Sequence, residues 1–123
     1  MAKPKLTAEQ QRRIEEIDEY RRATDHLKHL VLELEANRAG QTRTIQQLSE
    51  KIVAAASQMR QRALTANIGL IADVAGTMSV MAGRGGGVLM KIRALGDAVN
   101  SLYMQLDATL AHVMKPPEPR QPK

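Results

Sequence analysis

Two histidines three residues apart, His26 and His29, are the residues best placed by type and spacing to bind a metal ion. On a helix this spacing puts both imidazoles on one face, with the carboxylates of Asp25 and Glu33 nearby. Metal sites in helical bundles repeat a Glu-x-x-His arrangement on two helices, and no such pair occurs here. The third histidine, His112, is far away in sequence. We therefore interpret the histidines as surface residues and expect no metal site.

No nucleophile lies in a catalytic context. Ser79 and Ser101 have no histidine near them in sequence, and neither occupies a Gly-x-Ser-x-Gly elbow. The absence of cysteine excludes thiolate nucleophiles, thiolate zinc sites, iron–sulfur clusters and disulfides. Acidic pairs such as Glu15 and Glu16 lie among arginines, which is typical of ion pairs on a helix face. We predict that the chain is not an enzyme and uses neither a cofactor nor a small-molecule substrate.

A glycine-rich segment over residues 83–87 has two interpretations. Glycines before a helix can cradle a phosphate, and Arg84 would add positive charge. A P-loop, however, needs a preceding strand and a following Lys-Ser or Lys-Thr, whereas Lys91 is followed by Ile92. A tight turn between two helices is favoured, because glycine is the residue that such a turn tolerates best. The residues of this turn are Gly83, Gly85, Gly86 and Gly87.

Composition favours an all-α fold. A chain of 123 residues is long enough for one small domain or for a few long helices. Aromatic residues make up 2%, namely Tyr20 and Tyr103, so the core must be built from Ala, Leu, Ile, Val and Met. Stacking platforms for single-stranded nucleic acid need several aromatics on one face and are excluded. The net charge of +5 is a mild excess spread along the chain, which indicates a solvated surface rather than a phosphate-binding stripe.

Heptad spacing predicts an N-terminal coiled-coil helix over about 7–39. Thr7 and Gln10 form a capping-box pattern at its start. Apolar residues then recur at two heptad positions, and Thr24 is a polar interruption in the seam. One position holds Ile17, Val31, Ile45, Ile52 and Met59, and its partner holds Tyr20, Leu27, Leu34, Leu48 and Ala55.

The seam continues in phase past a segment without large apolar side chains at 35–44, and two alternatives are open there. Gly40 can follow a helix end, and Thr44 with Gln47 can restart a helix. The preserved heptad phase is instead typical of one helix from about Thr7 to Ala82. We favour a break near Gly40.

The C-terminal half predicts an antiparallel helical hairpin of about 42–82 with 88–114. Residues 63–82 carry one charge, Asp73, and need an apolar cover. The cleanest heptad run in the chain supplies it, and a Pro-rich tail over 115–123 then ends the last helix. This seam contains Ile92, Leu95, Val99, Leu102 and Leu106.

Three glycines one heptad apart, Gly69, Gly76 and Gly83, lie on a narrow strip of small residues. Because glycine lowers helix stability, the spacing indicates that another backbone approaches this strip, as at the centre of a multi-chain bundle. Alternatively, residues 63–82 are long enough for the hydrocarbon core of a bilayer, although Asp73 opposes a lipid-facing helix.

We therefore predict a flexible start (1–6), a charged coiled-coil region (7–62), an apolar glycine-containing hairpin (63–114) and a Pro-rich tail (115–123).

The expected function is that of a non-enzymatic, self-associating structural, scaffolding or adaptor component of a larger assembly. In architecture alone, such a chain resembles the small helical proteins of viruses or of secretion and conjugation machines. The expected partners are copies of the chain or other helical proteins. The alternatives are a membrane-active oligomer inserting through 63–114 and a basic helical protein associated with nucleic acid. With no signal-peptide pattern, cytoplasmic localisation is the expectation, peripheral or inserted membrane association remaining open. Helix packing and association are assigned to Ile45, Leu48, Ile52, Met59, Gly69, Asp73, Gly76, Ile92, Leu95, Val99, Leu102 and Leu106.

Overall fold

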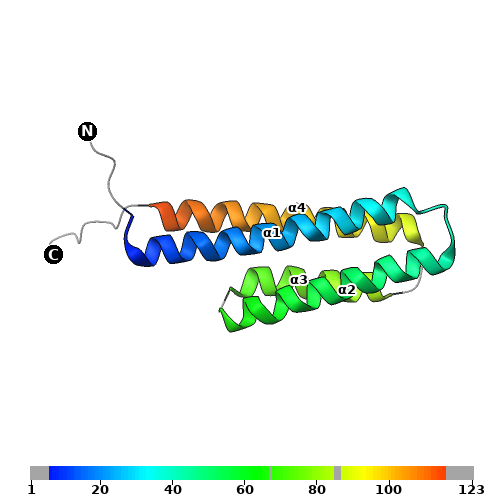
Figure 1. Cartoon of the computed structure of the whole chain (residues 1–123), viewed down its shortest axis with the longest axis horizontal. Coiled ribbons are helices and arrows are strands. Elements are labelled where there is room, and N and C mark those ends of the chain that lie inside the picture. The colour runs from blue at the N-terminus through cyan, green and yellow to red at the C-terminus, as the bar shows by residue number, and fades with distance from the viewer. Residues whose placement is uncertain (1–5, 67, 85–86, 116–123) are drawn as a thin grey trace.

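The computed structural model describes residues 6–66, 68–84 and 87–115, and in these ranges it is all-helical, as predicted. The helices are α1 (Ala8–Ala36), α2 (Thr42–Thr65), α3 (Gly69–Gly83) and α4 (Val88–Met114). They form an antiparallel bundle in which α1 packs against α2 and α4, and α3 packs against the same two helices (Figure 1). The diagonal pairs, α1 with α3 and α2 with α4, are separated by the core.

Helix α1 begins at the predicted capping box. The side chain of Thr7 accepts a hydrogen bond from the Gln10 backbone N–H at 3.0 Å, and the Thr7 N–H donates to Gln10 Oε1 at 2.9 Å. The predicted seam is buried along the helix. Thr24 is fully buried, and its hydroxyl donates to the Tyr20 carbonyl at 2.8 Å, so this polar residue is satisfied within its own helix.

The break near Gly40 is confirmed, and the alternative of one continuous helix is wrong. Helix α1 ends at Ala36, where the backbone and side-chain N–H groups of Asn37 both donate to the Glu33 carbonyl, at 3.1 and 2.8 Å. The Gly40 N–H donates to the Asn37 carbonyl at 2.8 Å and tightens the turn. Both helices bury an apolar stripe against the same core, so the shared heptad phase does not indicate a continuous helix.

The single helix expected over 42–82 is instead two helices, which corrects the predicted boundaries of the hairpin. Helix α2 is closed at its C-terminal end by hydrogen bonds from the Ala66 N–H to the Arg62 carbonyl at 2.9 Å and from the Ile68 N–H to the Ala63 carbonyl at 2.8 Å. The chain then reverses, so α3 packs along α2 as well as along α4. A straight helix of this length would have left much of its apolar surface without cover.

Buried alanines line the α2–α3 pair, which makes the most extensive contact of any two helices in the described chain. Ala56 and Ala63 of α2 are fully buried, as is Ala75 of α3, and Ala72 is almost so. Small side chains allow two helix axes to approach closely, because little volume stands between the backbones. The apolar stretch that looks unusual in sequence is therefore covered mainly within the chain itself.

The first turns of α1 and the last turns of α4 project past the turn between α2 and α3 (Figure 1). The side-chain amide of Gln10 donates to the Val113 carbonyl at 3.0 Å and joins the two helices there. The start of α1 and the end of α4 consequently lie side by side at one end of the bundle.

Candidate functional site

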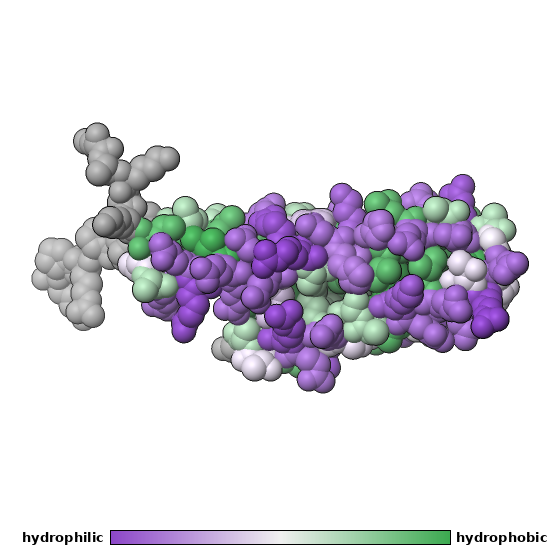
Figure 2. Space-filling model, in the orientation of Figure 1, coloured by the Kyte–Doolittle hydropathy of each residue, from purple (hydrophilic) through white to green (hydrophobic). Residues whose placement is uncertain are grey.

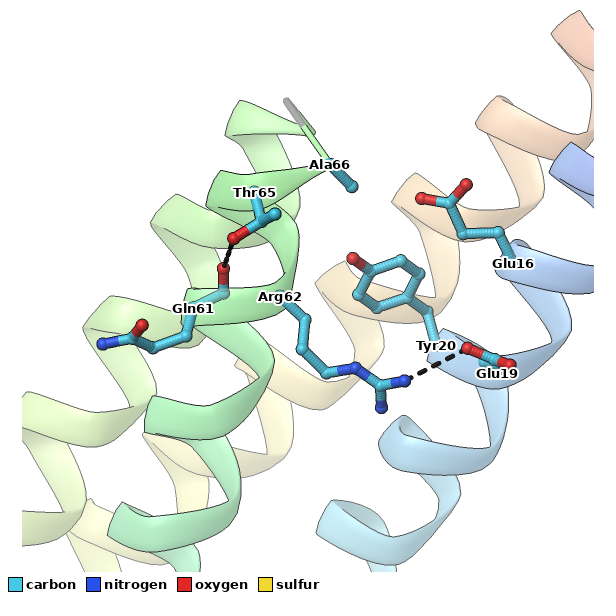
Figure 3. Close-up of a pocket in the computed structure, with 7 residues that line it drawn as sticks. All are labelled: Glu16, Glu19, Tyr20, Gln61, Arg62, Thr65 and Ala66. Atoms are coloured by element: carbon cyan, nitrogen blue, oxygen red, sulfur yellow. Dashed lines mark hydrogen bonds and ion pairs between the residues drawn. The ribbon is translucent and has the colours of Figure 1, made fainter.

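A groove between α1 and the end of α2 is the first candidate site (Figure 3). The Arg62 guanidinium reaches across it to Glu19, with Nη2 3.1 Å from Oε2. Burial, aided by the negative charge of Glu16, raises the pKa of the Tyr20 phenol above its ordinary value. No histidine or lysine lines this groove, and its titratable residues are two glutamates, the tyrosine and one arginine. The lining residues are Glu16, Glu19, Tyr20, Gln61, Arg62, Thr65 and Ala66.

The groove between α2 and α3 holds the predicted glycine strip. At Gly76, the Arg60 side chain lies across α3, with its Cδ 3.1 Å from where a Cβ would stand. At Gly83 the nearest atom is a methyl of Val53 at 3.7 Å, and at Gly69 the space is open to 4 Å. Side chains of α2, rather than a backbone, therefore approach two of these glycines within the described chain. A contact with another copy at this strip stays a prediction.

Asp73 and two serines complete the polar lining of this α2–α3 groove. Asp73 is exposed at its rim, and its backbone carbonyl accepts a hydrogen bond from Thr77. The hydroxyls of Ser57 and Ser79 are 2.8 Å apart and bond to each other. Since Ser79 uses its hydroxyl to join two helices and has no histidine beside it in the groove lining, it contributes to packing.

The histidines lie on the surface of α1. His29 Nε2 is 2.9 Å from Glu33 Oε1, one helical turn away, and both side chains are largely exposed. His26 is also exposed. No group of three potential metal ligands gathers anywhere in the described ranges.

Polar contacts fix the α1-facing side of α4. The Tyr103 hydroxyl donates to the Asp25 carboxylate, and Lys28 Nζ lies 5.9 Å from the centre of the same ring. Arg21 pairs with Asp107 at 3.0 Å one turn further along. Burial, followed by the hydrogen bond to Asp25, raises the pKa of Tyr103 to about 12. These contacts position α4.

The residues assigned to helix packing and association have two different environments. Most residues of the predicted apolar seams lie in the core of one chain. Those that are buried are Leu48, Ile52, Met59, Leu95, Val99, Leu102 and Leu106, whereas Ile45 and Ile92 are half-buried. Gly69 and Asp73 are exposed, and Gly76 is half-buried. Gly83 ends α3 and Gly87 is the N-cap of α4, whereas Gly85 and Gly86 lie outside the described residues.

The surface is divided into a charged side and an apolar side. Helix α1 carries thirteen charged residues, whereas α3 and α4 together carry five. The view over α1 and α2 is predominantly hydrophilic, with scattered apolar areas (Figure 2). Most of the large apolar side chains exposed to solvent belong to the other two helices: Leu70 and Val80 on α3, and Leu89, Met90, Met104 and Met114 on α4.

Helix α4 presents a second heptad row that the sequence analysis missed. Its members, which we call the outer strip, are Met90, Ala94, Asp97, Ser101, Met104 and Ala108. Met90 is 80% exposed and Met104 is 70% exposed, and none of the six belongs to the buried core. The fourteen-residue interval between the two methionines, two heptads, is visible in the sequence, but the aliphatic seam on the same helix is the stronger pattern.

The chain matches no family model, no curated protein and no solved structure. No helix in the described ranges combines the length and apolar character needed to cross a bilayer. The arrangement of the surface is consequently the feature from which a function can be argued.

Proposed function

We propose that this chain is a non-enzymatic helical assembly component that associates with copies of itself through the face formed by α3 and α4. The observation that carries the proposal is the concentration of exposed large apolar side chains on these two helices, which hold few charges. Removing apolar surface from water contributes roughly 25 cal/mol per Å², so covering this face would be favourable.

The charged side of the bundle supports the same proposal. With α3 and α4 covered, α1 and α2 would form the outer surface of the assembly. Helix α1 has both signs of charge along its length, and its pairs with other helices use only part of them. Such a surface keeps an assembly in solution and offers contacts to further protein partners, as a scaffold or adaptor requires.

Two observations weigh against the alternative functions. The segment 63–82, which the membrane alternative required as one helix, contains the reversal between α2 and α3. The arginines that a nucleic-acid-binding surface would use are partly engaged with carboxylates: Arg13 lies 3.6 Å from Glu9, and Arg62 lies 3.1 Å from Glu19.

The molar mass of the purified chain, measured by light scattering at increasing protein concentration, tests self-association. We expect twice 13.6 kDa or a higher multiple, with helicity unchanged on dilution. A mass of 13.6 kDa at every concentration would overturn the proposal. Flotation with liposomes, measured in parallel, would instead support a membrane role if the protein moved with the lipid.

A further inference from the structure

The outer strip of α4 has a spacing that is the same when read in either direction. Its residues are separated by intervals of four, three, four, three and four positions, from Met90 to Ala108. Over these positions the helix rises by about 27 Å, which gives a row long enough for another helix to lie along it. The order of side chains is large, small, acidic, hydroxyl, large, small.

We infer that this strip packs antiparallel against the same strip of a second copy, about a two-fold axis that crosses the interface midway between Asp97 and Ser101. The inference rests on the proposed self-association and names the surface that performs it. When the strip is reversed and laid on itself, Met90 faces the partner's Ala108 and Met104 faces the partner's Ala94. Each pair occurs twice, because a two-fold interface uses one patch on both subunits.

Packing of a large side chain against a small one is what makes this register fit. Met90 and Met104 project from α4 and are mostly exposed, so each can enter the space above an alanine of the facing helix. Methionine is flexible and fills such gaps readily. The alanines allow the two helix backbones to approach closely along the whole strip.

The polar pair at the centre of the strip selects the same register. Asp97 and Ser101 make no side-chain hydrogen bond or ion pair with another residue in the ranges that the structure describes. In the proposed arrangement the hydroxyl of Ser101 donates to the carboxylate of the partner's Asp97, and the reciprocal bond forms across the axis. Hydrogen bonds to a charged group are stronger than those between neutral groups.

Other registers of the two α4 helices place side chains of the same kind against each other. A parallel pair in register sets every residue against its own copy, so two Asp97 carboxylates would meet. An antiparallel pair centred on Asp97 does the same and also sets Met90 against the partner's Met104. Facing carboxylates repel each other, and facing methionines leave the alanines without a large neighbour.

The contacts of α4 with α1 leave the strip free for this role. Tyr103 and Asp107, which hold α4 to α1, lie outside the strip. The aliphatic seam represented by Leu95 and Leu102 is buried within the chain. A second copy can therefore occupy the strip without any change in the fold.

Exchange of the large and small positions tests the inference. Met90→Ala and Ala108→Met should each raise the dimer dissociation constant about tenfold or more. Met90→Ala leaves a gap at two symmetric places in the interface. Ala108→Met sets two methionines against each other. The double variant places a methionine at 108 against an alanine at 90 of the second copy, so it should restore the dissociation constant to within about threefold. Leu32→Ala, at a half-exposed position on α1, is the matched control and should change nothing.

The possible results separate the two proposals. A wild-type chain that is monomeric throughout would overturn self-association and the strip together. A wild-type oligomer whose dissociation constant is unchanged in both single variants would overturn the strip alone. Weakened single variants without rescue in the double variant would overturn the antiparallel register. Circular dichroism of each variant should show unchanged helicity, since both positions are on the surface.

Discussion

At the scale of single residues, Gly76 has a close neighbour within its own chain, while the predicted approach of another copy at this position stays a prediction. A small residue is required where another group lies against the helix, and that group is the flexible, exposed side chain of Arg60. Because Arg60 can shift by a few tenths of an ångström, the need for glycine at this position is weak within one chain.

We therefore expect Gly76→Ala to raise the free energy of unfolding by up to about 1 kcal/mol, since alanine is the better helix former. Urea unfolding followed by circular dichroism would measure the change, and light scattering should show an unaltered molar mass. A smaller mass would mean instead that another copy approaches Gly76, and a loss of stability at unchanged mass would mean that Arg60 does not move aside.

Tyr103 gives a pH dependence whose sign follows from its environment. Its pKa is raised to about 12, by burial first and then by the hydrogen bond to Asp25, whereas the unfolded chain titrates near 10. The contribution of this group to stability is therefore complete below pH 10 and is lost as the pH rises from about 10 to about 12. In a Tyr20→Phe background, Tyr103 is the sole tyrosine, and its phenolate absorbance reports the titration directly.

Asp25→Asn should lower the Tyr103 pKa toward its ordinary value, because the neighbouring negative charge is removed while burial remains. The same absorbance titration measures it. An unchanged titration would show that burial alone sets the pKa, and that the contact with Asp25 contributes little to the position of α4.

At the scale of elements, the α2–α3 pair depends on small side chains more than on large ones. Ala56 is fully buried on α2, in a helix pair that packs extensively. We expect Ala56→Leu to reduce the free energy of unfolding by about 1–3 kcal/mol, because three further carbon atoms have no space there. Ala54→Leu, at an exposed position on the same helix, is the control and should be nearly neutral. Equal effects in a thermal melt would contradict the close packing of this pair.

The sequence predicted the helical elements well where a local signal marked them. Thr7 and Gln10 identified the start of α1, Gly40 the first break, and Gly83 and Gly87 the end of α3 and the start of α4. The reversal between α2 and α3 escaped because apolar residues cover most of the circumference of residues 63–82. With such a pattern, periodicity does not distinguish one long helix from two helices that cover each other.

The candidate surface was predictable only in part for a related reason. The seam that includes Leu95 and Leu102 was read correctly as a packing face, but whether that face meets the same chain or another depends on topology. The reversal between α2 and α3 adds a helix to the bundle, and the bundle can then bury this seam within one chain. Association was therefore expected at residues most of which the core uses, and the exposed Met90 and Met104 were not among them.

At the scale of the whole molecule, the absence of cysteine makes the proposed dimer open to a direct geometric test. In the antiparallel register Asp97 faces the partner's Ser101, so a mixture of Asp97→Cys and Ser101→Cys chains should form a disulfide-linked dimer under mild oxidation. Non-reducing electrophoresis would measure the yield. Each variant alone should link much less, because its own cysteines lie about 6 Å apart along the helix axis. Efficient linkage of the Asp97→Cys chain by itself would indicate the register that sets this residue against its copy.

The contact between Gln10 and Val113 has a mechanical consequence. Since the start of α1 and the end of α4 lie side by side, a force applied to the two ends of the chain would pull these helices apart like a zipper. The contacts between them would break one turn after another rather than all together in shear. The bundle should therefore yield at low force when it is stretched by its ends, although the same contacts act cooperatively when it is unfolded by heat.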